Sequence, residues 1–229
     1  MSKLVEVSNL HKVYPGGSKV AALKGIHLVI SRGEFTALAG PSGSGKSTLL
    51  NMIGTLDRPT KGTVSYDGHV VSSLGPDPLS DFRLRSLGFV FQAYNLIPVL
   101  TAAENVEYPL ALQGVGRAER RGRAREALRR VGLVAEADRR PDLLSGGQQQ
   151  RVAVARAIVT RPSLVLADEP TANLDSKTGA QLLDLMQGLN KDHGITFLFS
   201  SHDSAVLERA RRVVRLQDGE LLSDETFSS

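Results

Sequence analysis

The chain has 229 residues and no cysteine. This absence excludes disulfides, thiolate catalysis and cysteine-ligated metal sites, and it fits a protein of the reducing cytosol. Long apolar runs are also missing. No segment approaches the ~18 uninterrupted apolar residues of a membrane span, and residues 1–7 lack the apolar stretch of a secretory signal. We therefore expect a cytoplasmic protein that acts at a membrane only through a partner.

A strong excess of one charge is absent as well, because the formal net charge is only +4. The arginine-rich segment 117–130 could form a nucleic-acid patch, but no aromatic residues lie among its charges to stack on bases. We favour a solvated helix in which Glu119 and Glu126 support nearby arginines, and we expect no nucleic-acid partner. The apolar side of this helix would comprise Ala118, Ala124, Ala127, Leu128 and Val131.

Short apolar or alternating segments recur along the chain and are typical of strands. They lie at residues 4–7, 20–30, 34–39, 62–68 (a strand that enters a turn), 87–91, 164–167, 195–199 and 213–216. Helices are predicted at 47–53, at 149–158 and at 177–190, and a helical insertion is predicted over about 101–138. Strands that alternate with helices predict an α/β fold with a mainly parallel sheet.

Residues 40–48 match the phosphate-binding pattern G-x-x-x-x-G-K-[ST] between an apolar strand and a helix. The glycines let backbone N–H groups surround phosphate oxygens, and the helix start adds partial positive charge. Lys46 would reach the β- and γ-phosphates, and Ser47 would bind Mg²⁺ through its hydroxyl. This ordered context argues against a chance glycine-rich turn. The predicted nucleotide-binding residues are Gly40, Ser42, Gly43, Ser44, Gly45, Lys46, Ser47 and Thr48.

Two carboxylates, Asp168 and Glu169, directly follow the apolar strand 164–167. In a parallel sheet this end of the strand faces the crevice beside the phosphate loop. Asp168 can then hold Mg²⁺ directly or through water, and Glu169 can polarise an attacking water. Paired acids on a surface loop are usually inert, but their place after a buried strand favours phosphoryl transfer.

A second anion site is predicted about a hundred residues after the first. Ser145 is a candidate N-cap for the helix at 149–158, and Gly146 and Gly147 expose backbone N–H groups beside Gln148. An ordinary capped helix is the alternative. The double glycine argues against it, because glycine weakens a helix unless another group must approach the backbone closely.

Together these motifs resemble the ATP-binding subunit of ABC transporters over essentially the whole chain, and residues 144–148 match that family's LSGGQ signature. The resemblance implies a phosphate-loop NTPase core with a mainly parallel sheet and an antiparallel β subdomain, plus a helical subdomain. The single domain 1–229 would divide into a catalytic core, 1–92 and 160–229, and a helical subdomain at approximately 93–159.

The resemblance also assigns roles to residues that mean little alone. Tyr14 would stack on adenine, although a lone tyrosine is more often a packing residue. Gln92 would contact Mg²⁺ or water and sense the membrane partner, and residues 173–175 would lie at a dimer interface. His202 would contact the γ-phosphate and, with Lys46, stabilise its charge. Ser47, Gln92 and Asp168 would then form the metal site, and Glu169 would be the base.

Residues 54–62, 91–102, 145–151 and 166–175 look like the lipoprotein-release and macrolide-export branch of LolD and MacB type, with departures at Ala172 and at Ser200-Ser201. This implies an ATP-hydrolysing subunit that needs ATP and Mg²⁺, dimerises with a second copy of itself and drives integral membrane permease subunits, in export or in lipoprotein or peptide extrusion. It would lie peripherally on the inner face of the cell membrane. The alternatives are a soluble ABC ATPase and an FtsE-like regulator that couples ATP to a non-transport membrane complex.

An apolar cluster follows Gln92 and predicts a docking groove for a short partner helix between this segment and the helical insertion. The alternative is that the cluster packs the insertion onto the core. Its members are Tyr94, Leu96, Ile97, Pro98, Val99 and Leu100.

Overall fold

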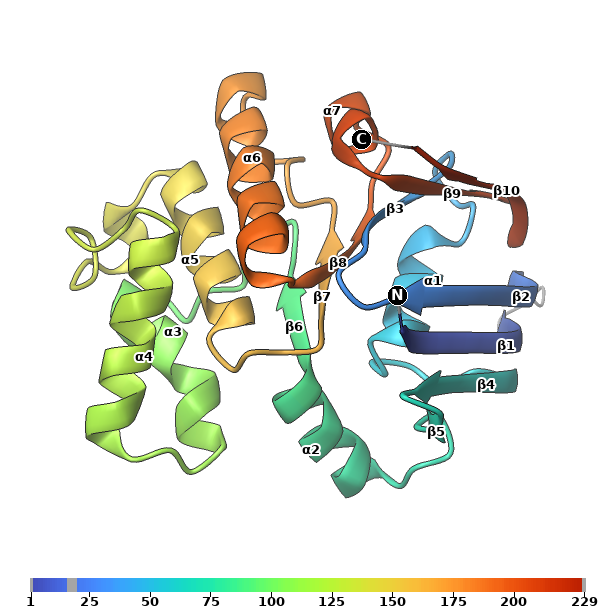
Figure 1. Cartoon of the computed structure of the whole chain (residues 1–229), viewed down its shortest axis with the longest axis horizontal. Helices are drawn as coiled ribbons and strands as arrows, with labels where there is room; N and C mark the ends of the chain where they lie inside the picture. Colours follow the sequence, from blue (N-terminus) through green and yellow to red (C-terminus); the bar gives the residue numbers. More distant parts are fainter. Residues whose placement is uncertain (1, 16–19, 228–229) are drawn as a thin grey trace.

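The structure, a computed structural model, describes residues 2–15 and 20–227. Its elements alternate between strands and helices, as the sequence predicts (Figure 1). In chain order they are β1 (Lys3–Tyr14), β2 (Val20–Ser31), β3 (Phe35–Ala39), α1 (Lys46–Ile53), β4 (Lys61–Tyr66), β5 (His69–Val70), α2 (Pro76–Ser86), β6 (Leu87–Val90), α3 (Ala102–Leu112), α4 (Arg117–Arg130), the short 3₁₀ turn η1 (Pro141–Leu143), α5 (Gly146–Ile158), β7 (Leu164–Asp168), α6 (Ser176–His193), β8 (Thr196–Ser200), α7 (Ser204–Arg209), β9 (Arg212–Gln217) and β10 (Glu220–Thr226).

The central sheet has the strand order β10-β9-β3-β8-β7-β6. All its neighbours are parallel except the antiparallel pair β9 and β10, which confirms the mainly parallel prediction. Along β7, Leu164 and Leu166 belong to the buried cluster around α1, whereas Val165 and Ala167 belong to the cluster around α3–α6. Because both faces are buried, the strand is almost continuously apolar.

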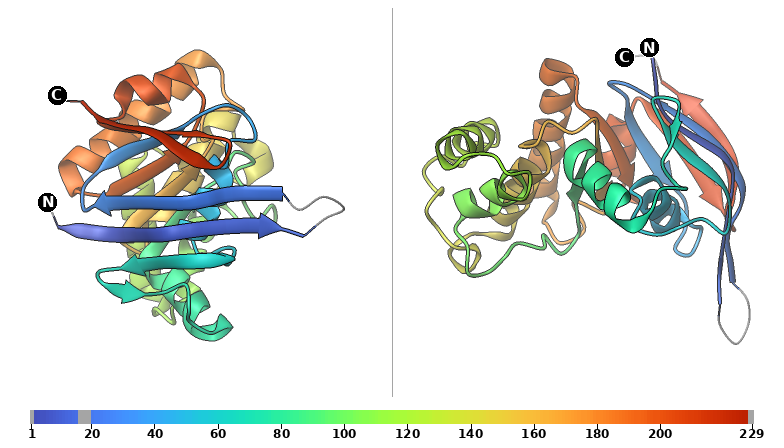
Figure 2. Two further views of the ribbon diagram at one scale, coloured as in Figure 1. Left: turned by 90° about the vertical axis from the view of Figure 1, so that its right-hand side faces the viewer. Right: turned by 90° about the horizontal axis from the view of Figure 1, so that it is seen from below.

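A second, antiparallel sheet has the order β2-β1-β4-β5. Helix α1 lies between the two sheets (Figures 1 and 2). Its apolar residues Leu49, Leu50, Met52 and Ile53 are buried with side chains from both sheets. This packing fixes the start of α1, and therefore the phosphate loop before it, against the edge of the parallel sheet.

The helices α3, α4 and α5 form a layer on the other side of the central sheet (Figure 1). They fall within 93–159, but their buried cluster continues into the sheet through Phe35 and Ala37. The subdomain boundaries therefore stay a prediction. No helix in residues 2–15 and 20–227 is long and apolar enough to cross a membrane.

Helix α4 has the solvated face that its charges predict. Glu126 accepts hydrogen bonds from Arg129 at 2.7 Å and Arg130 at 3.0 Å, and these bonds lower the pKa of its carboxyl to about 2. Ala124 and Leu128 are fully buried. Ala118 is exposed, contrary to the prediction, because it lies in the first turn of the helix, away from the core contact.

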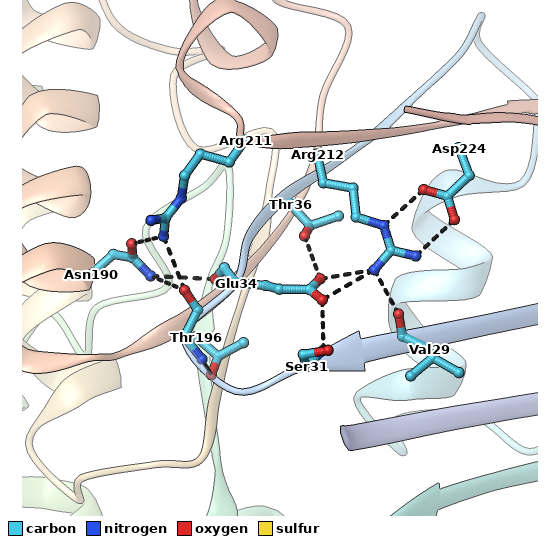
Figure 3. Close-up of polar contacts among 10 residues, drawn as sticks. Val29, Ser31, Glu34, Thr36, Asn190, Thr196, Arg211, Arg212 and Asp224 are labelled. Carbon is cyan, nitrogen blue, oxygen red and sulfur yellow. Dashed lines mark hydrogen bonds and ion pairs between the residues drawn. The ribbon is translucent and has the colours of Figure 1, made fainter. Parts of the chain in front are cut away.

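Arg212, the first residue of β9, joins the two sheets (Figure 3). Its guanidinium donates to the Val29 carbonyl on β2 at 2.7 Å, to Glu34 at 2.9 Å and to Asp224 on β10 at 2.7 Å. The Asp224 hydrogen bond raises the pKa of Arg212 against the opposing effect of burial. Arg212 therefore fastens the antiparallel sheet and the C-terminal strand to the core.

Several elements have no counterpart among the sequence predictions. Helix α2 buries only Leu79, so its apolar periodicity is weak. Strand β10 lies at a sheet edge and has no fully buried residue, so its alternation is weak too. Helix α7 is only six residues long. Strand β1 also continues to Tyr14, well beyond the predicted 4–7. A helix or strand is predictable from the sequence when one of its faces is strongly buried, because only then do its apolar residues follow a clear period.

Candidate nucleotide-binding site

The phosphate loop leaves the end of β3 and enters α1. Its first glycine, Gly40, has φ +148°, and a side chain there would overlap the backbone carbonyl of Leu216. Gly45, at the N-cap of α1, has φ +102°, a region that favours glycine. Lys46 donates to the carbonyls of Gly40 at 2.8 Å and Pro41 at 3.0 Å, which holds its ammonium group over the loop.

A cleft of about 720 Å³ lies beside this loop. Most of the phosphate loop lines it, together with Gln92, Glu169 and His202. These three residues follow β6, β7 and β8, and parallel strands bring their carboxyl ends to one edge of the sheet. The structure therefore brings together the predicted residues from both ends of the chain, in a space large enough for a nucleotide.

The predicted metal ligands Ser47 and Asp168 are in contact, because Ser47 Oγ donates to Asp168 Oδ1 at 3.0 Å. A hydroxyl and a carboxylate oxygen side by side suit Mg²⁺, which binds through few protein ligands and completes its shell with water and phosphate oxygens. Within the described residues, no three or more His, Cys, Asp or Glu side chains gather as a metal site. The residues present fit a magnesium ion shared with a nucleotide.

Glu169 is held by its neighbours from the end of β8. Its carboxylate accepts hydrogen bonds from His202 Nδ1 at 2.7 Å and from Ser201 Oγ at 3.1 Å. Its backbone N–H donates to the Ser200 carbonyl at 2.9 Å, and its φ of +44° is uncommon for a residue with a side chain. The turn after β7 therefore aims this carboxylate into the cleft and fixes it there.

The Gln92 segment is joined to residues 173–175. Gln92 is exposed, and its backbone carbonyl accepts from Asn173 Nδ2 at 3.0 Å. The Tyr94 hydroxyl donates to the Asn173 carbonyl at 3.4 Å. Asp175 then caps α6, and hydrogen bonds from Thr178 lower the pKa of its carboxyl. Two segments that the resemblance assigns to sensing and to a dimer interface are therefore in direct contact.

Tyr14, predicted to stack on adenine, lies at the end of β1. Its hydroxyl donates to Asp57 Oδ2 at 3.0 Å, and Lys12 Nζ lies 4.7 Å from its ring centre. Burial and the Asp57 carboxylate raise the pKa of the Tyr14 hydroxyl. Tyr14 is not among the described residues that line the cleft, so its contact with adenine stays a prediction.

The signature segment forms the capped helix start that the sequence predicts. Ser145 Oγ accepts from the Gln148 N–H at 3.3 Å, and Gln148 Oε1 accepts from the Ser145 N–H at 2.9 Å. The N–H groups of Gly146 and Gly147, in the first turn, have no acceptor within the helix. A side chain at Gly147 would also overlap Thr178, so this glycine is needed for packing as well.

The signature segment lies away from the cleft of its own chain. None of residues 145–148 is among the described residues that line it. Helices α1 and α5 lie on opposite faces of the central sheet (Figure 1). The two predicted anion sites are therefore separate within one chain.

The turn between β9 and β10 supports the phosphate loop and was not predicted. The Gly219 N–H donates to the Ser44 carbonyl at 3.1 Å, and the Gly219 carbonyl accepts from the Lys24 N–H at 2.8 Å. Asp218 and Gly219 both have positive φ, +49° and +82°. An Asp-Gly pair is a strong signal for such a two-residue turn, so the sequence did contain the information.

A second groove, of about 460 Å³, lies between β6, α2, α3 and α5. Its exposed apolar side chains include Leu56, Tyr108 and Leu112. Of the cluster predicted for docking, Ile97 is among the described residues that line this groove, and Tyr94, Leu96, Pro98, Val99 and Leu100 are not. Tyr94 turns toward Asn173 and Leu96 packs on the core, because the chain reverses through left-handed conformations at Tyr94 and Asn95. The groove therefore includes Ile97 of the predicted cluster, and Leu96 follows the packing alternative.

A phosphate loop that faces Asp168 and Glu169 across the edge of a parallel sheet defines a phosphate-loop nucleoside triphosphatase. Residues 23–172 match the family described as ABC transporter. Because this match covers well over half of the chain, the chain belongs to the ABC transporter family, as one of its ATPases.

Known proteins resemble the whole chain. It is 47% identical over 225 residues to the lipoprotein-releasing system ATP-binding protein LolD of Geobacter metallireducens, covering 98% of this chain and 100% of that protein. It is 48% identical to the macrolide export ATP-binding/permease protein MacB of Syntrophobacter fumaroxidans, covering 94% of this chain and 31% of that protein. A dimeric, post-hydrolysis structure of the ATP-binding cassette MJ0796 with ADP and Pi has a TM-score of 0.90 at 45% identity, covering 99% of this chain and 100% of that one.

Proposed function

We propose that two copies of this chain hydrolyse Mg²⁺-ATP at a shared interface and drive a membrane partner. The separation of residues 145–148 from the cleft of their own chain carries this proposal. A second copy could place its exposed helix start against the nucleotide that the first copy holds. The dimeric MJ0796 cassette with ADP and Pi supports this arrangement.

The geometry of the cleft gives each residue a distinct part in hydrolysis. Glu169, oriented by His202 and Ser201, accepts the hydrogen bond of the attacking water and polarises it. Lys46 and His202 stabilise charge on the γ-phosphate. Ser47 and Asp168 would hold Mg²⁺, which would supply positive charge beside the phosphate groups. Gln92 lies at the same cleft and orients the metal shell or the water.

The groove between α2, α3 and α5 is the proposed binding site for the membrane partner. Its exposed apolar residues suit the apolar face of a short helix. Asn95 and Ile97 line the groove only a few residues after Gln92, so a partner helix there would contact the segment that reaches the cleft. Docking would keep the chain on the inner face of the cell membrane.

The likeness to LolD and MacB favours export or the extrusion of lipoproteins or peptides. The chain spans about a third of the length of the MacB relatives and all of the LolD relative. The alternative is an FtsE-like regulator that couples ATP to a non-transport membrane complex. The identity of the membrane protein that co-purifies with the full chain distinguishes these two possibilities.

The shared-site proposal is tested with Glu169→Gln, which keeps the shape of the side chain and removes its basicity. We expect ATP binding to survive while turnover falls by about 10²–10⁴-fold. Because the shared site exists only in the dimer, bound ATP then shifts the monomer–dimer equilibrium toward the dimer. Light scattering at micromolar concentration should show a dimer with Mg²⁺-ATP and a monomer with ADP. A monomer under both conditions would contradict the shared site.

A further inference from the structure

Gln150 is a buried polar residue that none of the roles above uses. It lies in the second turn of α5 and is fully buried, at 0% exposure. Its Nε2 donates to the Pro170 carbonyl at 2.7 Å and to the Phe91 carbonyl at 3.2 Å. Its Oε1 has no hydrogen-bond partner among the described residues. A buried amide with an unpartnered oxygen is unfavourable compared with an apolar side chain, so packing alone does not explain it.

The two carbonyls that Gln150 binds belong to the residues next to the proposed reactive groups. Phe91 immediately precedes Gln92, and Pro170 immediately follows Glu169. One amide group therefore sets the separation between the backbone at Gln92 and the backbone at Glu169. Both of these side chains line the nucleotide cleft.

The same helix holds the far side of the Gln92 segment. Arg156 donates to the Tyr94 carbonyl at 2.8 Å and to the Asn95 carbonyl at 2.5 Å. Tyr94 and Asn95 have φ values of +59° and +50°, which are uncommon for residues with side chains. Helix α5 thus fixes this segment on both sides of Gln92, and the helix itself begins with the signature segment.

We propose that Gln150 is a positioning residue for hydrolysis, an inference that rests on the function proposed above. It holds Gln92 and Glu169 at the separation at which Glu169 would direct a water toward the γ-phosphate while Gln92 would contact that water or the metal ion. Because it lies two residues after the signature segment on the same helix, it also ties the movement of that segment to both groups. A second copy that displaces the signature segment would act through Gln150 on the reactive groups of this copy.

Two substitutions in the full chain test this role. Gln150→Met keeps the size of the side chain and removes its donor. Gln150→Glu keeps the shape, but its carboxyl can donate only when protonated, and burial beside two carbonyls favours the protonated form. Gln187→Met is the matched control, because Gln187 on α6 also donates to a backbone carbonyl, that of Arg209, outside the cleft. Steady-state kcat and KM for ATP are measured with Mg²⁺ from pH 6 to pH 8.

A substitution far from the reacting atoms that misplaces them by about 1 Å can lower a rate by about 10²-fold. We therefore expect Gln150→Met to lower kcat by about 10- to 100-fold. The KM for ATP should change less than about threefold, because Lys46 and the phosphate loop are untouched. The kcat of Gln150→Glu relative to the parent should rise as the pH falls from 8 to 6, since protonation restores one donor. Gln187→Met should match the parent.

A Gln150→Met kcat within about threefold of the parent, or a Gln150→Glu kcat that is low and does not rise relative to the parent at low pH, would overturn the positioning role. If Gln150→Met fails to fold, the pH dependence of Gln150→Glu decides alone. Failure of the proposed function is distinguishable, because it would appear in the parent, which would then lack Mg²⁺-dependent ATPase activity.

Discussion

His202 Nδ1 lies 2.7 Å from Glu169 Oε1, and the contact joins the turn after β7 to the turn after β8. The histidine side chain is 74% exposed and the glutamate only 18%. The imidazole is therefore free to meet a phosphate on one side while it orients the carboxylate on the other. We expect both effects to act on hydrolysis rather than on folding or on the affinity for the nucleotide.

We expect His202→Ala to lower kcat by about 10²-fold and to leave the Kd for ATP almost unchanged, because the phosphate loop remains intact. Phosphate release and an equilibrium titration measure the two quantities separately. His193→Ala, at an exposed histidine in the last turn of α6, is the control. A kcat for His202→Ala equal to that of His193→Ala would remove His202 from the reaction.

We expect Lys46→Ala to weaken the binding of ATP. Lys46 Nζ is held over the loop by the Gly40 and Pro41 carbonyls, where a phosphate would meet it. Hydrogen bonds to charged groups contribute about 1.5–3 kcal/mol, so the Kd for ATP should rise at least about tenfold. Titration with a fluorescent ATP analogue measures this, with Lys191→Ala as the control on an exposed lysine. An unchanged Kd would contradict the assignment.

The dependence of activity on magnesium should distinguish the roles of Asp168 and Glu169, which follow each other in sequence. EDTA should abolish hydrolysis by the parent. Asp168→Asn weakens the pair with Ser47 and should raise the Mg²⁺ concentration needed for half-maximal activity by about tenfold or more, with partial recovery at high Mg²⁺. Glu169→Gln should not recover at any Mg²⁺ concentration. Identical magnesium curves for the two variants would show that the roles are wrongly divided.

If the groove binds the membrane partner, a substitution in it should abolish stimulation by the partner and leave the basal ATPase activity intact. Leu112 lines the groove and is 58% exposed, whereas Val134, 56% exposed, lies elsewhere on the helical layer and outside the groove. Leu112→Glu should abolish co-purification with the membrane partner and partner-stimulated ATPase activity, and basal activity should be unchanged. Val134→Glu should behave like the parent in all three assays. Loss of basal activity in Leu112→Glu would mean that Leu112 supports the core instead.

The Arg212 network predicts a loss of stability without a loss of activity (Figure 3). Glu34→Gln would leave Arg212 with a weaker partner in a place where both side chains are largely buried, at 14% and 17% exposure. Breaking such a pair should lower the free energy of unfolding by about 2–4 kcal/mol. Urea denaturation measures this, and kcat of the folded variant should match the parent. A change below about 0.5 kcal/mol would show that the pair is not stabilising.

Elements with strong local signals were predicted well. The phosphate loop, the capped start of α5 and the apolar strands β7 and β8 all depend on neighbouring residues: glycine conformations, a capping side chain, or burial on both faces. The docking cluster was predicted less well, because the left-handed turn at Tyr94 and Asn95 is held by Arg156, which lies 62 and 61 positions away along the chain. The alternation of apolar residues and the residue types in this segment do not predict the contact with Arg156.

The sequence by itself determined the phosphate loop and the capped start of α5, and it predicted a metal-binding aspartate, a base and a second anion site from consecutive residues. The tertiary structure alone decided how they meet. Ser47 and Asp168 touch across 121 positions, and Glu169 and His202 across 33. The order of the parallel strands sets these distances, and it arises from the packing of whole faces. The same packing gives Gln150 its two carbonyls, which no local pattern could reveal.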